Sequence, residues 1–291
     1  MNFKNNYGLF WVLPLFIVFL LTTIFPLLYV LNMSFMENYL PFRSPQYNGL
    51  KNYKEIFLDP LFHKVLWNTI VYVFFSVFFH ILISLFLAFF LDKKKSLSRA
   101  AKALRVIYIV PWLLSWSAAS AIWLLILNPS GILNGLISTL GGGRIQTAWF
   151  GEPRFAMFWI LVVTIWKAQP FFMMMIYAAL SSAPEELYES ASLDGANAFQ
   201  KFIYISFAHI KPIVLTLTIL DVIWSLRQFE VFQLTTGGGP LDVTRTLSLH
   251  VYSTAFESLR FGMASSFGVI ILIISSFLSF TYLRIYRRTE K

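Results

Sequence analysis

The chain has no cysteine, and charged side chains are scarce. Without cysteine, disulfides, thiol nucleophiles and thiolate metal sites are excluded. Aspartate, glutamate, lysine and arginine make up 13% of the 291 residues, about half of their usual share in a soluble domain. The four histidines lie far apart and lack the spacing of metal ligands, so we expect no metal site. They are His63, His80, His209 and His250.

Apolar residues dominate instead. They form 57% of the chain, phenylalanine alone occurs 31 times, and the mean hydropathy is +0.67. A soluble fold has no room to hide this much apolar surface, so part of the solvent must be lipid. The formal net charge of +9 does not indicate nucleic acid, because the basic residues form short clusters between apolar runs.

Six apolar runs are long enough to span a membrane, whose core of about 30 Å takes roughly 20 residues per helix. The first run is too long for a signal-peptide core and lacks a small-residue cleavage site. The fourth is predicted to break at Lys167-Ala168-Gln169-Pro170, because proline removes a backbone donor. We expect an all-α, polytopic membrane protein with a single transmembrane domain over 1–291. The expected spans are 9–31, 69–91, 106–127, 155–180, 210–232 and 265–283.

Basic residues predict the orientation of these spans. The loop between the second and third spans, DKKKSLSRAAKALR, carries six Lys or Arg. Four more follow the last span, namely Arg284, Arg287, Arg288 and Lys291. Positive clusters mark cytoplasmic loops, and an even number of spans puts both termini on one side. We therefore expect both termini in the cytoplasm, the connections 32–68 and 233–264 outside, and a location in the cytoplasmic (inner) membrane.

A polar stretch, ESASLDGANAFQKF, interrupts the apolar sequence after the fourth span. Ser182 stands three residues before Glu185, which is the spacing of a capping box, and Gly195 offers the left-handed conformation of a helix end. Asn197 then caps a second helix, with a glutamine at its box position. We expect two short cytoplasmic helices that meet at a glycine corner within 182–209. The pattern alone supports a partner surface and a plain connector equally.

The same segment, continued as YESASLDGANAFQKFIYISFAHIKP, resembles the loop of binding-protein-dependent ABC importer permeases. Their motif is Glu-Ala-Ala, three residues and Gly, and Glu189-Ser190-Ala191 is followed here by Gly195 at that spacing. A serine replaces the central alanine, and Phe207-Ala208 stands where Leu-Pro is usual. In that family the loop helix docks into a cleft on the cytoplasmic ATPase. The resemblance implies ATPase coupling by Glu189, Ser190, Ala191, Asp194 and Gly195.

Three further segments resemble the carbohydrate-uptake branch of this family, so the likeness covers nearly the whole chain. They are YNGLKNYKEIFLDPLFHKVLWNT (47–69), VPWLLSWSAASAIWLLILNPSGILN (110–134) and LTTGGGP (234–240), the last resembling the maltose-type F subunit. The resemblance implies the type I ABC importer permease fold. It also implies a second, G-type permease subunit, two cytoplasmic ATPase subunits that bind ATP and magnesium, and an extracytoplasmic solute-binding protein. This chain would then be non-catalytic and hold no cofactor.

Polar side chains at membrane depth are costly and commonly face a cavity or a partner. One such group occurs in DVIWSLRQFE of the fifth span. Helical spacing predicts that Asp221, Trp224 and Gln228 share one face. It also predicts that Arg227 and Glu230, on a neighbouring face, are close enough to pair.

A sugar pathway needs polar groups for hydroxyls and an aromatic face for the C–H surface. Resemblance to the maltose-type subunit puts sugar contacts near 164–168 and 226–230. A satisfied Arg227–Glu230 pair and a Lys167 that reaches toward an interface remain the alternative. The candidate pathway residues are Thr164, Lys167, Trp224, Arg227, Gln228 and Glu230.

Two other functions compete with the permease hypothesis. An ion-coupled secondary transporter would use intramembrane charges without an ATPase, but the inverted repeat expected of it is not evident. A membrane enzyme acting on lipid or glycan would use Asp221 and Glu230 as an acid–base pair, but no nucleophile motif supports it. The sequence also lacks Gly-x-x-x-x-Gly-Lys-Ser/Thr, so nucleotide binding by that motif is not expected.

Overall fold

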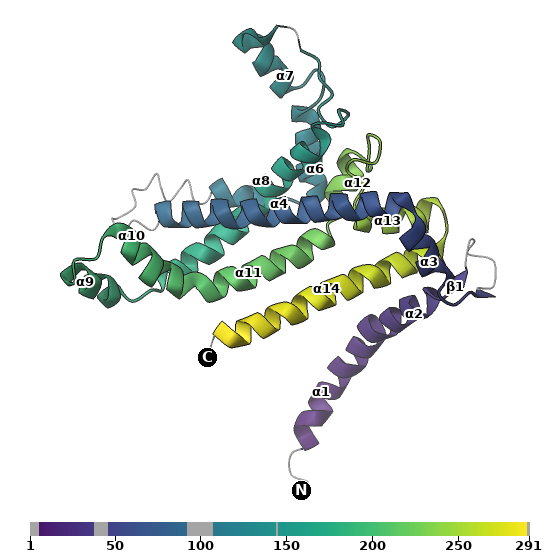
Figure 1. Ribbon diagram of the computed structural model, residues 1–291, viewed down its shortest axis with the longest axis horizontal. Coiled ribbons are helices and arrows are strands. Elements are labelled where there is room, and N and C mark those ends of the chain that lie inside the picture. Colours follow the sequence, from purple (N-terminus) through teal and green to yellow (C-terminus); the bar gives the residue numbers. More distant parts are fainter. Residues whose placement is uncertain (1–5, 38–45, 92–106, 144, 290–291) are drawn as a thin grey trace. The chain divides into compact units, whose positions relative to one another are not determined.

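The computed structural model describes residues 6–37, 46–91, 107–143 and 145–289, and these are mostly helical (Figure 1). Two compact units are present. The first holds the described residues of Met1–His63 and His250–Ile274, and the second those of Lys64–Leu249 and Ser275–Lys291. The basic loop DKKKSLSRAAKALR lies outside the described residues.

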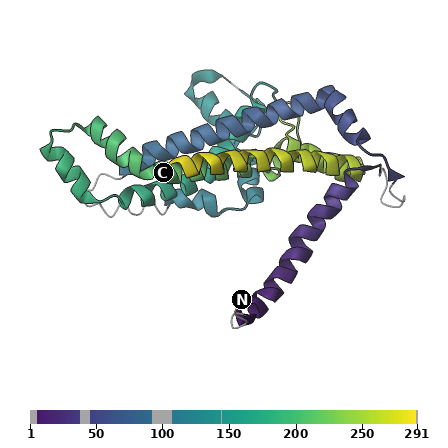
Figure 2. The same cartoon turned by 60° about the horizontal axis from the view of Figure 1, so that its bottom comes forward.

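The first unit begins with a helical rod, seen in purple in Figure 2, and continues through a small antiparallel ribbon to a short helix. Its elements are α1 (Asn6–Phe19), the π-helix η2 (Leu20–Ile24), α2 (Phe25–Met33), β1 (Met36–Glu37), β2 (Gln46–Tyr47) and α3 (Lys51–Leu58). Helix α4 (Pro60–Leu91) starts here and runs on into the second unit. Near the C-terminus come α13 (Leu247–Tyr252), the π-helix η5 (Ser253–Glu257) and α14 (Phe261–Thr289).

A group of hydrogen bonds around Ser34 connects the elements of the first unit. The Asn52 amide donates to the carbonyl groups of Ser34 and Met36, at 2.9 and 3.0 Å. The Tyr53 hydroxyl donates to the Ser34 hydroxyl at 2.8 Å, and the Ser266 hydroxyl donates to the Ser34 carbonyl at 2.9 Å. These bonds tie α3 and α14 to the end of α2, and those from Asn52 and Ser266 satisfy carbonyl groups there.

The second unit holds the helices that follow α4 in the chain, up to α12. They are Ile107–Leu113, α6 (Trp116–Ile126), α7 (Ile132–Ile137), the π-helix η3 (Ser138–Gly142), α8 (Ala156–Ser181), α9 (Glu185–Leu193), α10 (Ala198–Lys201), the π-helix η4 (Phe202–Phe207), α11 (Ala208–Leu226) and α12 (Glu230–Thr235). Helices α9 and α10 project from one end of α8 and α11, and α12 lies toward the other end (Figure 1).

Two apolar clusters of the second unit pack α4 and α8, one of them against α11 and the other against α12. The cluster nearer α9 comprises Ala88, Phe172, Ile176, Leu180, Ile210 and Leu217. The cluster nearer α12 comprises Tyr72, Leu127, Phe150, Ile160, Val163, Val231, Phe232 and Leu249. Between helices in lipid such clusters hold by van der Waals packing, because lipid tails are as apolar as the side chains.

The predicted all-α, polytopic architecture is confirmed. Among the described residues, five helices are long and apolar enough to cross a membrane, and a sixth span results if one bent pair counts as a single crossing. The five are Val12–Met33, Pro60–Phe90, Ala156–Ser181, Ala198–Leu226 and Phe261–Arg284. The bent pair is Ile107–Leu113 with Trp116–Ile126, at 110°.

Three details of the predicted spans are wrong. The third span is not continuous, because Ser115 ends one helix and caps the next by accepting from the Ala118 amide at 3.1 Å. The fourth is not broken, because α8 continues through Pro170, which is buried in the core. The fifth does break, since α11 stops at Leu226 and α12 starts at Glu230.

Candidate functional site

The first candidate site is the elbow of residues 182–209, formed by α9, a glycine corner and α10. Helix α9 ends at Asp194, and Gly195 follows with φ at +79°. The Ala196 amide then donates back to the Ala191 carbonyl at 2.9 Å. A left-handed glycine with this backbone bond is a helix stop of the Schellman type. The predicted glycine corner is therefore confirmed.

The two helix starts in the elbow differ in how well the sequence predicted them. Asn197 and Gln200 form the predicted capping box, in which each side chain bonds the other residue's backbone amide at 2.9 and 2.8 Å. The box predicted for Ser182 and Glu185 is wrong. Pro184 occupies the cap of α9, and the Ser182 hydroxyl donates to the Ala179 carbonyl at 2.8 Å.

Side-chain contacts brace the elbow against the spans. The hydroxyl groups of Tyr188 and Ser206 are 2.9 Å apart, and Lys201 donates to Ser192 at 2.6 Å. These two contacts join α9 to the segment that leads into α11. At the base of the elbow the Ser182 hydroxyl lies 3.1 Å from His209 Nε2, so the ends of α8 and α11 are bonded side chain to side chain.

One aromatic contact ties the elbow to α4. The rings of Phe89 and Phe202 meet edge to face with centroids 4.5 Å apart, a geometry that aromatic pairs prefer. The elbow therefore contacts α4 as well as the ends of α8 and α11.

The outer face of the elbow is free in the described structure. Glu189, Ser190, Asp194 and Gly195 are exposed, and Ala191 is partly buried. Small side chains let another backbone approach closely, and the two carboxylates offer charge to a basic partner. Leu193 is 90% exposed at the tip of α9. The sequence reasoning passed over it, although an apolar residue directly before an Asp-Gly corner is a signal for an exposed apolar contact.

The second candidate site is an open pocket of about 460 Å³ in the second unit. Its lining combines aromatic rings with an amide and charges of both signs: Trp116, Trp224, Arg227, Gln228, Phe229 and Glu230. Four of these residues, from Trp224 to Glu230, were predicted pathway residues, while Trp116 and Phe229 were missed. Apolar walls with a few polar groups are the usual build of a small-molecule site.

The pocket exists because the fifth predicted span is broken. The chain leaves the helix at Arg227 and re-enters one at Glu230, so the intervening residues present their side chains beside the break. Irregular backbone at membrane depth occurs where it lines a cavity or is buried in protein. The break also separates Arg227 from Glu230, and the described structure contains no ion pair between them. The predicted i, i+3 pairing is wrong for this reason.

Lys167 and Thr164 lie behind the pocket rather than in its wall. The Lys167 ammonium group sits over the Trp116 ring, 4.4 Å from the centroid. Thr164 is buried, and its hydroxyl donates to the Ile160 carbonyl at 2.8 Å. Their contact with substrate stays a prediction.

A buried polar pair stands on the far side of Trp224. Asp221 and Trp224 lie one turn apart on α11 as predicted, although Asp221 is buried and Trp224 is 43% exposed. The predicted face does not extend to Gln228, which lies past the helix end. The Asp221 carboxylate bonds His80 Nδ1 of α4 at 2.8 Å. Sequence spacing gave no signal for this pair, because its members are 141 positions apart.

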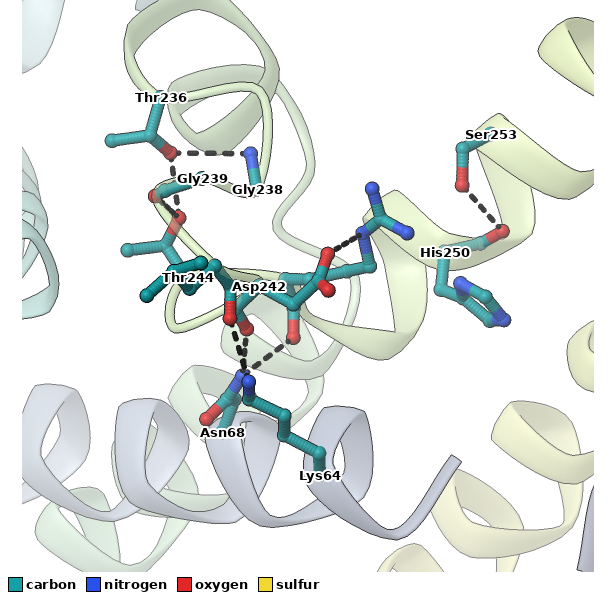
Figure 3. Close-up of polar contacts among 11 residues, drawn as sticks. Lys64, Asn68, Thr236, Gly238, Gly239, Asp242, Thr244, His250 and Ser253 are labelled. Atoms are coloured by element: carbon teal, nitrogen blue, oxygen red, sulfur yellow. Dashed lines mark hydrogen bonds and ion pairs between the residues drawn. The ribbon is translucent and has the colours of Figure 1, made fainter. Parts of the chain in front are cut away.

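A rigid loop follows α12. Figure 3 shows Lys64 and Asn68 of α4 reaching the carbonyl groups of Leu241 and Asp242, at 2.6 and 2.8 Å. Thr244 closes the loop by donating to the Gly239 carbonyl at 2.7 Å. The glycine run of TTGGGP is thus a fixed turn in the described structure, with its backbone held by side chains.

Comparison with known proteins identifies the family. The family described as "binding-protein-dependent transport system inner membrane component" matches residues 64–291. The "Probable ABC transporter permease protein YurN" of Bacillus subtilis is 30% identical over 240 residues, which is 82% of each chain. The "Sulfoquinovosyl glycerol transport system permease protein SmoG" of Agrobacterium fabrum is 30% identical over 279 residues, covering 95% of this chain and 89% of that one.

A third relative and a solved structure agree with this match. The "Trehalose/maltose transport system permease protein MalF" of Thermococcus litoralis is 28% identical and covers 96% of this chain and 93% of that one. A crystal structure of a bacterial ABC transporter for the acidic polysaccharide alginate has a chain with TM-score 0.83, at 23% identity, covering 99% and 98% of the two chains. That likeness shows the same fold. The chain belongs to the family of inner membrane components of binding-protein-dependent transport systems.

Proposed function

We propose that this chain is the permease subunit of an ATP-driven ABC importer that moves a sugar or oligosaccharide across the cytoplasmic membrane. One observation carries the proposal. The exposed elbow of 182–209 joins α8 to α11, and α11 ends at the pocket. A force applied to the elbow by a partner is therefore delivered to the helix that shapes the pocket. Family membership weighs against the ion-coupled alternative, which has no use for such a partner surface.

The elbow docks on cytoplasmic ATPase subunits in this proposal. Glu189 and Asp194 meet basic groups of the partner, Ser190 and Ala191 allow close backbone approach, and Leu193 fills an apolar hollow. ATP and magnesium bind to the two ATPase subunits. This chain is non-catalytic, converting their closure into a rearrangement of its spans, which is a population shift between two states.

The pocket is the substrate pathway. Trp116, Trp224 and Phe229 offer faces to the C–H surface of a sugar, and Gln228, Arg227 and Glu230 bond its hydroxyls. Relatives named for sulfoquinovosyl glycerol, trehalose/maltose and diacetylchitobiose support a carbohydrate substrate. Lys167 and Thr164 join the pathway when the spans rearrange.

The remaining partners follow from the family. A second, G-type permease subunit completes the pathway, and an extracytoplasmic solute-binding protein delivers the sugar. A related structure titled as an alginate transporter in complex with a periplasmic protein supports that assembly. Both termini lie in the cytoplasm, which puts the elbow on the ATPase side.

The test is sugar uptake by proteoliposomes that hold this chain, its partner permease and the ATPase subunits. Uptake that needs internal ATP and a loaded binding protein, and that persists when an ionophore collapses ion gradients, is the expected result. Uptake that needs no ATP but stops with the ionophore would show a secondary transporter instead. Absence of uptake for every sugar of a broad panel would reject a sugar substrate.

A further inference from the structure

A polar layer crosses the second unit midway between its two apolar clusters. Along α4, Tyr72 belongs to one cluster and Ala88 to the other, and His80 lies between them. His80 and Asp221 are 1% and 2% exposed. Ionisable groups at the middle of membrane-spanning helices are expensive and are retained where they have a function.

The layer joins three spans through one imidazole ring. His80 Nδ1 of α4 is 2.8 Å from the Asp221 carboxylate of α11, and His80 Nε2 is 3.5 Å from the Thr164 carbonyl of α8. The Tyr72 hydroxyl adds a second link from α4 to α8, since it lies 3.3 Å from the Thr164 hydroxyl. Ser225 donates to the other oxygen of Asp221 at 3.4 Å.

The same ring is packed toward the pocket. His80 stacks on Phe172 with centroids 5.0 Å apart and planes at 16°. Phe172 in turn meets the edge of Trp224, a pocket residue, at 6.3 Å. Asp221 is one turn before Trp224 on α11, and Thr164 is one turn before Lys167 on α8. The polar layer therefore lies between the elbow and the pocket, on the helices that connect them.

We propose that His80 and Asp221 fasten α4, α8 and α11 into one rigid lever, so that elbow movement reaches the pocket without slippage between the helices. Between hydrocarbon-like surfaces, apolar packing alone permits sliding, because lipid tails are as apolar as the side chains they replace. A directional bond between buried charged or polar groups fixes the register. This role rests on the proposed function, since it presupposes an ATPase that moves the elbow. His80 is a positioning residue, with no contact to substrate.

The measurement is the number of sugar molecules imported per ATP hydrolysed by the reconstituted complex. His80→Leu removes the bond, whereas His80→Asn keeps a donor near the position of Nδ1. Ser84→Ala is the matched control, because Ser84 is also buried on α4 and accepts from Gln169 of α8 at 3.4 Å, without reaching α11. Co-purification of all subunits is checked for every variant.

We expect His80→Leu to lower the sugar-to-ATP ratio about tenfold while ATP hydrolysis continues. Without the bond, the helices no longer move together, so ATP is hydrolysed without sugar import. His80→Asn should stay within about threefold of wild type, and Ser84→Ala within about twofold. An unchanged ratio in His80→Leu would overturn the fastening and leave the proposed function intact. A wild-type complex that imports no sugar would instead overturn the proposed function and the fastening with it.

Asp221→Asn tests the proposal if the complex with His80→Leu does not assemble. It keeps the side-chain volume and an oxygen acceptor but removes the charge. The expected result is an assembled complex with a ratio lowered at least threefold, since the neutral bond is roughly half as strong. A wild-type ratio in this variant would contradict the proposal.

Discussion

The backbone conformation of Gly195 determines the shape of the elbow. Its φ of +79° lies in a region that most side chains avoid, and an added Cβ would meet nothing within 4 Å. The requirement is therefore one of conformation and not of space.

Replacement of Gly195 separates these two requirements. Gly195→Pro should abolish sugar-stimulated ATP hydrolysis, because the ring fixes φ near −65° and the corner is lost. Gly195→Asn should keep most of the stimulation, since asparagine adopts the left-handed region at a cost of about 1 kcal/mol. Stimulation is measured on assembled complexes. Equal stimulation in wild type and Gly195→Pro would show that the corner is not needed.

Gly262 illustrates the opposite requirement, that of space. A Cβ at this position would clash with the Met36 carbonyl oxygen. Gly262→Ala should lower the melting temperature of the purified protein, through overpacking worth about 1–3 kcal/mol. Gly268→Ala is the control, because its nearest neighbour is Val30 Cγ1 at 4.0 Å. Two variants that melt alike would rule out the close approach of α14 to residue 36.

At the scale of elements, α10 is the first turn of the continuous helix Ala198–Leu226. The first amides of a helix have no partner within it, so this turn relies on its capping box. Asn197→Ala should destabilise α10 by about 1 kcal/mol, seen as faster hydrogen exchange at the Gln200 amide. Asn197→Asp keeps the acceptor and should exchange at the wild-type rate. Unchanged exchange in Asn197→Ala would mean that tertiary contacts, such as Phe202 with Phe89, hold the segment instead.

Local signals in the sequence predicted most elements and one part of the site. Hydrophobic runs located the spans, and the Asn197 box and Gly195 corner were predicted because their partners lie within three or four residues. The break at residues 227–229 was missed, because nothing in that stretch forbids a helix and packing decides it. Trp116 was missed for a related reason, since the pocket brings it from a different helix.

Sequence spacing could not predict contacts between residues that lie far apart in the chain. His80 and Asp221 look like isolated polar residues until α4 and α11 are placed together. Pro170 misled the prediction because proline removes one backbone bond, yet α8 continues through Pro170, which is buried.

At the scale of the whole molecule, the proposed functional segments lie in the second unit. The elbow, the polar layer and the pocket all fall within Lys64–Leu249, and the family match starts at residue 64. In the proposed mechanism a partner's movement enters at α9 and leaves at the pocket. Glu189 and its neighbours receive that movement.

The most direct measurement of this claim is sugar-stimulated ATP hydrolysis by the reconstituted complex with Glu189→Lys, across a panel of binding proteins loaded with different sugars. Glu186→Lys, one turn earlier on α9, makes the same charge change where no contact is assigned. The account predicts that one class of sugar stimulates wild type and Glu186→Lys. In Glu189→Lys the stimulation should fall at least tenfold while the subunits still co-purify, as loss of an interfacial charge pair entails. Normal stimulation in Glu189→Lys would contradict the account and make the elbow a simple connector.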